Sequence, residues 1–127
     1  MSEVLLDSSA LMALLNEESG AYFVAEHVRT SAVSAVNLSE VVTKLCARGI
    51  SDDDARGALE AIGFEVIAFE EAQVYRCGWL NSFTSKLGLS LGDRACLSLS
   101  KMLGLPALTA DRAWAKLNVG VDITVIR

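Results

Sequence analysis

The sequence predicts an α/β fold in which a central, mostly parallel sheet is flanked by helices. The chain has 127 residues, of which 52% are hydrophobic and only 6% aromatic, and short aliphatic runs alternate with longer stretches of helical periodicity. Strands separated by helices pair in parallel, because a parallel connection needs a long crossover. A chain of this length normally builds one core, so we predict a single domain over residues 1–127.

The first half of the sequence predicts two strands and four helices. Val4–Leu6 and Ser31–Ser34 are short runs typical of buried parallel strands. Ser8 and Ser9 can cap the helix that follows the first strand, and Ser51 can open the fourth helix with a capping box. The expected helices run from residue 10 towards 20, from 21 to about 28, from about 36 to 49, and from 51 onward.

The second half continues the alternation with three further strands. The strands are expected at 64–69, 107–109 and 123–126, and the helices at 70 to about 87, at 93–103 and shortly after 111. In parallel sheets of this kind, ligands bind beyond the carboxyl ends of the strands. We therefore expect the functional residues at that edge.

Two aspartates stand where this rule matters. Asp7 directly follows the first strand, and Asp111 lies just past the fourth. If those strands are neighbours, the two carboxylates face one crevice. Each aspartate is also a good N-cap for the helix that follows it, so a purely structural interpretation stays open for both.

Two further acids have structural interpretations of their own. Asp93 fits a capping box with Ser90 at the start of an amphipathic helix. Glu40 lies opposite the apolar stripe of its helix, and periodicity alone predicts a solvated side chain that pairs with Lys44 one turn later.

The four acids occur in four short segments, LLDSSAL at 5–11, SAVNLSE at 34–40, LGDRACL at 91–97 and LTADRAW at 108–114. In this order they resemble the PIN-domain ribonucleases, and among them the VapC-type toxins. The resemblance implies a three-layer α/β fold and an acidic cleft that binds Mg²⁺ or Mn²⁺ and hydrolyses RNA. The residues matching the acidic positions are Asp7, Glu40, Asp93 and Asp111, and Thr109 matches the small hydroxyl residue near them.

The resemblance also implies partners and one departure from the pattern. Relatives usually act as the toxin of a toxin-antitoxin pair, so we expect a cognate antitoxin protein, and the apolar surplus of the chain suits an antitoxin groove or a homodimer face. Some relatives carry a further acid shortly after the last motif aspartate. Trp114 occupies that region here, which leaves open how a second metal ion would be bound.

Carboxylates suit the expected chemistry. They are hard oxygen ligands that select Mg²⁺ or Mn²⁺ over zinc, and the sequence has a single histidine and no CxxC pair. We predict Asp7 and Asp93 as the metal anchors. Glu40 and Asp111 would complete the shell directly or through water, and one of them would orient the attacking water.

The formal net charge of −5 is unusual for a nucleic-acid enzyme. Two bound divalent ions would add four positive charges and leave about −1. Five basic residues lie in segments flanking the expected cleft, and each is an RNA-contact candidate as well as an ordinary solvated residue: Lys44, Arg48, Arg94, Arg112 and Lys116. We expect weak, salt-sensitive RNA binding.

The remaining features are assigned structural roles. Cys46, Cys77 and Cys96 are expected in the core, and Trp79 and Trp114 as packing anchors. No run of the sequence predicts a membrane span or a secretory signal, so a cytoplasmic protein is expected.

Two other functions remain open at this stage. One is a PIN-like module that binds protein or RNA without cutting it. The other is a Mg²⁺-dependent phosphohydrolase, which also uses an aspartate after its first strand, although the sequence lacks the second aspartate of the haloacid-dehalogenase motif, a P-loop and a dinucleotide fingerprint.

Overall fold

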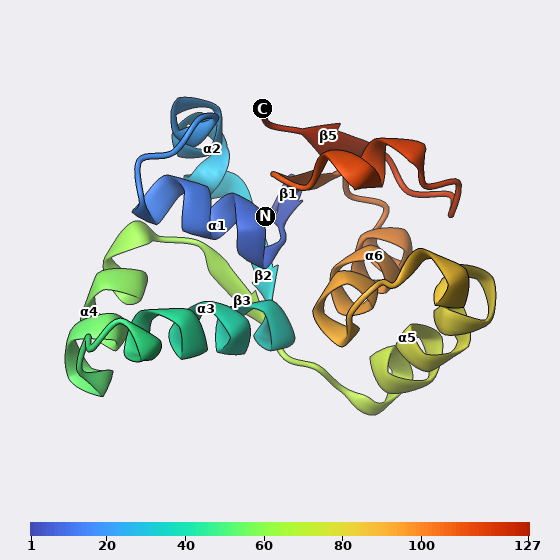
Figure 1. The fold of residues 1–127 in the computed structure, drawn as a ribbon, viewed down its shortest axis with the longest axis horizontal. Coiled ribbons are helices and arrows are strands. Elements are labelled where there is room, and N and C mark those ends of the chain that lie inside the picture. The colour runs from blue at the N-terminus through green and yellow to red at the C-terminus, as the bar shows by residue number, and fades with distance from the viewer.

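The computed structural model describes residues 1–127 and contains a five-stranded sheet in which every neighbouring pair of strands is parallel (Figure 1). The strand order is β3-β2-β1-β4-β5. The strands are β1 (Val4–Leu6), β2 (Ser31–Ser34), β3 (Glu65–Ile67), β4 (Ala107–Thr109) and β5 (Ile123–Val125). From β1 the sheet extends through β2 to β3 on one side, and through β4 to β5 on the other. The carboxyl ends of β1 and β4 therefore form a topological switch point.

Six α-helices cover the two faces of the sheet. Four of them lie on one face and two on the other, with the sheet between them (Figure 1). The first group is α1 (Ser8–Leu15), α2 (Ala21–His27), α3 (Ala35–Ala47) and α4 (Asp52–Ile62), and the second is α5 (Glu71–Thr84) and α6 (Leu91–Leu103). Three short 3₁₀ segments complete the fold: η1 (Val28–Thr30), η2 (Ser85–Leu87) and η3 (Arg112–Lys116).

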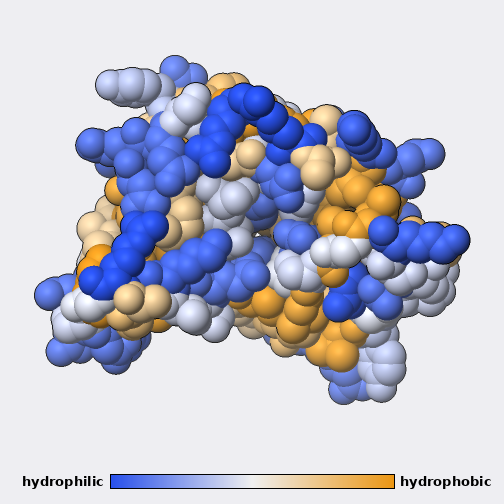
Figure 2. Space-filling view, viewed as in Figure 1, coloured by the Kyte–Doolittle hydropathy of each residue, from blue (hydrophilic) through white to orange (hydrophobic).

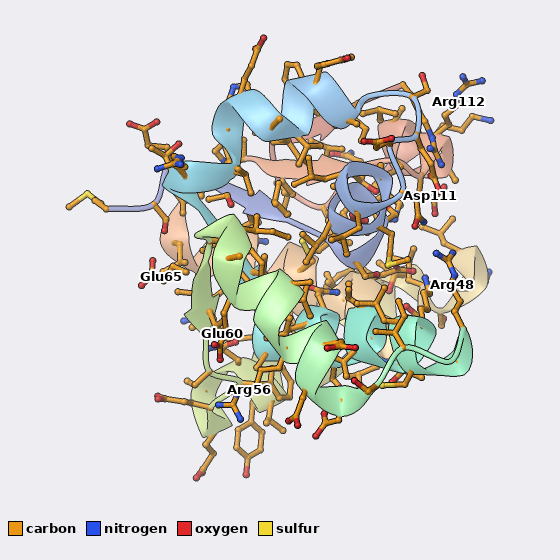
Figure 3. The ribbon with its side chains drawn as sticks, turned by 90° about the vertical axis from the view of Figure 1, so that its left-hand side faces the viewer. Arg48, Arg56, Glu60, Glu65, Asp111 and Arg112 are labelled. Atoms are coloured by element: carbon orange, nitrogen blue, oxygen red, sulfur yellow. The ribbon has the colours of Figure 1, made fainter.

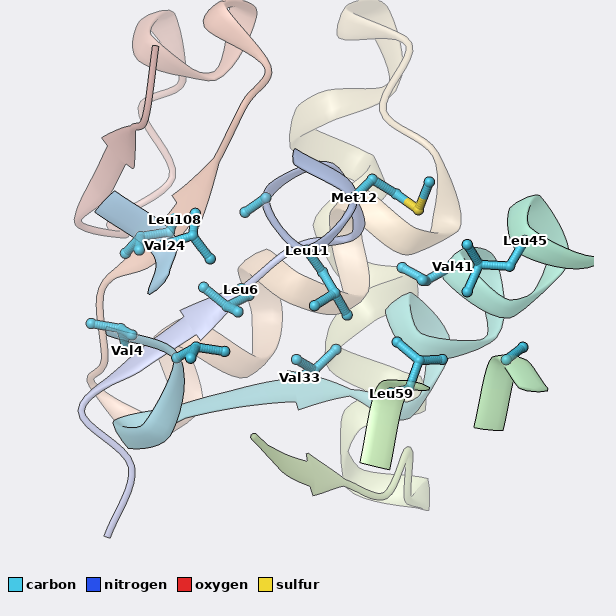
Figure 4. Packing of buried hydrophobic residues seen from close by; sticks show 13 residues of the cluster. Val4, Leu6, Leu11, Met12, Val24, Val33, Val41, Leu45, Leu59 and Leu108 are labelled. Carbon is cyan, nitrogen blue, oxygen red and sulfur yellow. The ribbon is translucent and has the colours of Figure 1, made fainter. Parts of the chain in front are cut away.

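The core is divided by the sheet into two apolar clusters. Successive residues of a strand point to opposite faces, so Leu6 packs with α1, α3 and α4 while Leu5 packs with α5 and α6. Figure 4 shows the larger cluster, in which Leu6 and Val33 of the sheet lie against Leu11 of α1 and Val41 of α3. Both faces of β1 are therefore dry, and the polar residues that follow it sit at the edge of a rigid platform.

The predicted α/β architecture is confirmed, with shifts at several element ends. The third strand is shorter than expected, and the long helix after it ends at Thr84 and continues as the 3₁₀ segment η2. The helix after β1 is capped by Asp7 and not by the serines that follow, because the Asp7 carboxylate accepts the hydrogen bond from the backbone N–H of Ala10.

Ser51 accepts a hydrogen bond from the backbone N–H of Asp54, as expected of an N-cap. The reciprocal bond of a capping box, from the Ser51 backbone N–H to the Asp54 carboxylate, is not formed there, and Asp54 acts as an acid in the first helical turn.

Two packing expectations were wrong. Trp114 is fully buried, but Trp79 is 65% exposed, because the buried residues of α5 lie on the opposite side of that helix. Cys77 and Cys96 are buried, whereas Cys46 is exposed, since its neighbour Leu45 occupies the inward position of α3. None of the helices has both the length and the apolar character needed to cross a bilayer.

Candidate active site

Asp7 is the one buried acid of the chain. It stands between β1 and α1 and its side chain is only 3% exposed. Oδ1 accepts hydrogen bonds from the Ala10 backbone N–H at 2.8 Å and from the Ser9 hydroxyl at 2.7 Å, and Oδ2 accepts one from the Thr109 hydroxyl at 2.5 Å. The carboxylate is therefore fixed in one orientation at the switch point of the sheet.

Two hydroxyl groups join the ends of β1 and β4. The Ser9 hydroxyl oxygen accepts a hydrogen bond from the backbone N–H of Ala110 at 2.8 Å, and the hydroxyl oxygen of Thr109 accepts one from the backbone N–H of Asp111 at 3.0 Å. Because the same hydroxyls donate to Asp7, the two strand ends form one hydrogen-bonded unit.

Asp93 caps α6, as the sequence indicates. The backbone N–H of Ser90 donates to its Oδ2 at 3.0 Å, and the Ser90 hydroxyl accepts from the Asp93 backbone N–H at 3.1 Å. Asp93 is half-buried, and its charge is close enough to Asp7 to raise the pKa of that carboxyl group. The capping interpretation and the functional one are therefore compatible.

Glu40 is not the solvated, lysine-paired residue that periodicity alone predicts. It is half-buried between α3 and α6, where its Oε1 accepts a hydrogen bond from Nδ2 of Asn37 at 3.0 Å, and it forms no ion pair with Lys44. The contact with α6 is made at Gly92, the residue before Asp93. Helical periodicity cannot predict this contact, because Gly92 lies on a different helix from Glu40.

Asp111 is the outlying member of the set. Asp111 is exposed. Its Oδ1 accepts a hydrogen bond from the backbone N–H of Ala113 at 3.0 Å, so Asp111 is the N-cap of η3. Figure 3 shows it at the margin of the molecule beside Arg112. The connection to the other acids runs through Thr109, which binds both the Asp111 backbone and Asp7.

The electrostatics of the site centre on Asp7. Burial, and to a lesser degree the charge of Asp93, raises the pKa of Asp7 from 3.8 to about 6, although the hydrogen bonds from Thr109, Ala10 and Ser9 lower it. The same acids affect the buried thiol of Cys96. Burial, and to a lesser degree the charges of Asp7, Asp93 and Glu40, raises the pKa of this thiol well above its ordinary value. Asp7, Asp93 and Glu40 thus all act on the pKa of this one thiol.

The donor set fits a hard divalent cation. Its members are carboxylate and hydroxyl oxygens, and a cation would relieve the unfavourable burial of the Asp7 charge beside Asp93. No three acidic, histidine or cysteine side chains are grouped closely enough to enclose an ion by themselves. Mg²⁺ tolerates such a site, because it is commonly bound by one or two carboxylates and retains several waters.

An open groove leads away from Glu40 between the start of α3 and the start of α6. Glu40, Lys44, Phe69 and Ser90 contribute to its walls. The face seen in Figure 2 is hollowed near its centre, where the surface is mainly polar, with apolar surface on either side.

The candidate cations around the site differ in their freedom. Arg94 is half-buried and donates from Nη1 to the Cys77 carbonyl oxygen at 3.0 Å, so it braces α6 against α5. Arg48 and Arg112 lie on the same side of the molecule as Asp111 (Figure 3). Lys44 borders the groove and forms no ion pair.

Comparison with known sequences decides the family. The pattern that defines the PIN domain matches residues 4–120. The chain belongs to the PIN domain family. No curated protein sequence matches this PIN domain.

Solved structures with the same fold come from several bacteria. A toxin-antitoxin complex from Klebsiella pneumoniae is 17% identical, with a TM-score of 0.77 over 98% of each chain. DNA-bound VapBC from Salmonella typhimurium is 14% identical, with a TM-score of 0.76 over 100% of each chain. VapC20 from Mycobacterium tuberculosis, a toxin that cleaves the sarcin-ricin loop, is 18% identical, with a TM-score of 0.74 over 94% of this PIN domain and 99% of that chain.

Sequence reasoning missed three polar or small residues of the site: Ser9, Asn37 and Gly92. The sequence offers a signal for Ser9, which stands two residues after Asp7 where a hydroxyl can bond back to the cap. Asn37 has a weaker signal, since a buried amide within the apolar stripe of α3 needs partners. Gly92 has none, because its role depends on a side chain 52 positions away.

Proposed function

We propose that this PIN domain is a metal-dependent endoribonuclease that acts as the toxin of a toxin-antitoxin pair. The observation that carries the proposal is the buried Asp7 carboxylate, which is fixed by Ser9, Ala10 and Thr109 and whose pKa of about 6 is raised partly by Asp93. A buried carboxylate beside a second one is an electrostatic cost that a bound cation removes.

Each acid has a distinct part in this proposal. Asp7 and Asp93 are the metal anchors, since their charges interact at the switch point. Glu40 supplies a third negative charge from α3, and Asp111 keeps Oδ2 free to accept a hydrogen bond from a water on the exposed side. Thr109 positions Asp7 and the Asp111 backbone at once.

A divalent cation, Mg²⁺ or Mn²⁺, would supply two effects when bound: a lower pKa for a coordinated water and neutralisation of charge on the scissile phosphate. The chain itself orients the carboxylates and excludes water from the inner side of Asp7. Without the cation the acids would repel a phosphodiester, so cleavage should depend strictly on it.

The groove beside Glu40 is the proposed path of the RNA. An extended strand laid along it would pass Lys44 at one end and reach the acids at the other. With few free cations and a net charge of −5, binding should be weak and should weaken further with salt.

The proposed protein partner is a cognate antitoxin. Two of the similar structures are a toxin-antitoxin complex and a DNA-bound VapBC assembly, which supports such a partner for a chain of this fold. Expression of the product of a short neighbouring reading frame together with this chain should suppress RNA cleavage and give a complex that survives size-exclusion chromatography.

We also propose a homodimer. Several large apolar side chains are exposed along α5, among them Val74, Tyr75, Trp79 and Phe83. Burying such a row against a second copy would remove apolar surface from water, which is the usual driving force for association.

The experiment is incubation of labelled ribosomal and transfer RNA with the purified chain in Mg²⁺, in Mn²⁺ and in EDTA. We expect cleavage only with a metal, and a loss of at least about 100-fold in Asp7→Asn and Asp93→Asn. Glu26→Gln, on the exposed side of α2, is the matched control and should cleave like the wild type.

The same assay separates the two other functions. Binding of RNA without cleavage in either metal would favour a PIN-like module that has lost activity. Release of phosphate from a generic phosphomonoester, with intact RNA, would favour a phosphohydrolase. Metal-dependent cleavage by Asp7→Asn at the wild-type rate would overturn the assignment of the site.

A further inference from the structure

Asn37 is buried at 1% exposure, in the first turn of α3, and both hydrogens of its side-chain amide are used. Nδ2 donates to Oε1 of Glu40 at 3.0 Å and to the backbone carbonyl oxygen of Gly92 at 3.0 Å. The amide therefore connects an acid of α3 with the backbone of α6, one residue before Asp93.

The orientation of the amide is set by its two acceptors. A flipped amide would point its oxygen at a carboxylate and at a carbonyl, both of which repel it. In the observed orientation Oδ1 is buried and accepts no hydrogen bond. An unpaired buried carbonyl costs stability, so Asn37 is a poor choice for packing alone.

Gly92 forms the opposite wall of the same site. A Cβ built at this position would stand 2.2 to 2.4 Å from the Glu40 carboxylate oxygens and carbon. Gly92 is buried in the first turn of α6 and its φ is not in the left-handed region, so backbone conformation does not require glycine here. What requires it is the space that the Glu40 carboxylate occupies.

We propose that Asn37 and Gly92 form a slot that fixes the Glu40 carboxylate beside Asp93, and that Asn37 is a positioning residue which acts on the active site through Glu40. The inference rests on the proposed function for its effect on catalysis. The slot itself, made of an amide donor on one side and a bare backbone on the other, belongs to the metal-free chain.

The first test is a double-mutant cycle between Asn37→Ala and Glu40→Gln. We expect each variant alone to weaken Mn²⁺ affinity, measured by titration calorimetry, and kcat for RNA cleavage by about 10-fold to 100-fold. If Asn37 acts through Glu40, the double variant should be no worse than Glu40→Gln. Losses that multiply would overturn the proposal, because a merely structural asparagine would act independently of Glu40.

The second test is Gly92→Ala, which keeps Asn37 but fills the slot. The atoms in the way are the end of a flexible side chain, so we expect the fold to remain and the Glu40 carboxylate to move. Thermal stability should be close to that of the wild type, while Mn²⁺ affinity falls by about 10-fold or more. Gly57→Ala in α4 is the matched control, since no atom stands within 4 Å of the added Cβ.

A nuclear magnetic resonance readout separates the slot from the proposed function. In the metal-free protein, the side-chain amide signals of Asn37 should shift in Glu40→Gln and in Gly92→Ala, and stay in place in Gly57→Ala. Absence of metal-dependent cleavage in the wild type would refute the nuclease proposal and leave this readout intact. Asn37 amide signals that Gly92→Ala does not move would refute the slot.

Discussion

Thr109 donates its hydroxyl hydrogen to Oδ2 of Asp7 at 2.5 Å, although the two residues are 102 positions apart. The bond crosses from β4 to β1 and lowers the pKa of Asp7 against the larger effect of burial. Thr109→Val keeps the shape and removes the donor, so the pKa of Asp7 should rise further above about 6. Because protons then compete better with the metal, the pH profile of cleavage should move to higher pH.

Stability should respond as well, because the backbone N–H of Asp111 loses its acceptor in Thr109→Val. We expect a loss of about 1–3 kcal/mol in the free energy of unfolding, measured with urea. Thr109→Ser retains the hydroxyl and should keep the wild-type pH profile. An unchanged profile in Thr109→Val would show that the hydroxyl does not control Asp7.

The raised pKa of Asp7 also makes the metal-free protein less stable as pH rises. Below pH 3.8 the carboxyl group is protonated in both the folded and the unfolded chain, and between 3.8 and about 6 it is protonated only in the folded one. Folding therefore loses about 3 kcal/mol of stability from this group as the pH rises through about 6.

Asp7→Asn removes this pH dependence, because an amide does not titrate in this range. The amide oxygen can still accept the hydrogen bond from the Ala10 backbone N–H, so the helix cap is kept. In EDTA at pH 7.5 the variant should be more stable than the wild type, by up to about 3 kcal/mol, in urea unfolding. Addition of Mn²⁺ should stabilise the wild type and not the variant. A variant that is less stable than the wild type at every pH would contradict the burial cost assigned to Asp7.

Asp93 and Ser90 share one capping box, which allows structure and function to be separated. Ser90→Ala removes the hydroxyl that accepts from the Asp93 backbone and leaves the carboxylate in place. We expect a loss of about 1 kcal/mol in unfolding free energy and retention of most cleavage activity. Asp93→Asn keeps an acceptor for the Ser90 backbone N–H and should retain stability while cleavage is lost.

The pKa of Asp7 provides an independent check on the same pair. The charge of Asp93 raises that pKa, so Asp93→Asn should lower it and Ser90→Ala should leave it at about 6. Carboxyl carbon chemical shifts measured against pH report the value directly. A pKa that does not change in Asp93→Asn would show that the two acids do not interact.

The sheet, its helices and the position of Asp7 at a strand end could be predicted from the sequence, because aliphatic runs and helical periodicity are local patterns. The pairing of β1 with β4 stayed open at the level of the sequence, because the alternation of elements predicts parallel strands but not their order in the sheet. Glu40 shows the limit: its carboxylate is placed by Asn37 and Gly92, and the second of these lies on another helix. Contacts between elements far apart in the sequence leave no periodic signal.

Trp79 shows the same limit at the surface. Aromatic character predicts burial, but the exposure of Trp79 is set by which side of α5 faces α6. The Trp79 ring lies exposed, edge-on to Phe83, with ring centroids 4.9 Å apart.

If a second copy covers Trp79 and Phe83, Trp79→Glu should halve the mass measured by light scattering. The free energy of unfolding of the monomer should change by less than about 0.5 kcal/mol, because the side chain has few contacts to lose.

Glu26→Gln is the control for this variant, since it changes the charge of an exposed residue on α2 and should leave the mass unchanged. The proposed dimer predicts a wild-type mass of about twice 13.6 kDa at micromolar concentration. Trp79→Glu should stay monomeric even at high salt. The variant loses apolar contact between the two copies, and ions that screen charge do not restore that contact. A wild type that is monomeric throughout would refute the dimer without affecting the assignment of Asp7.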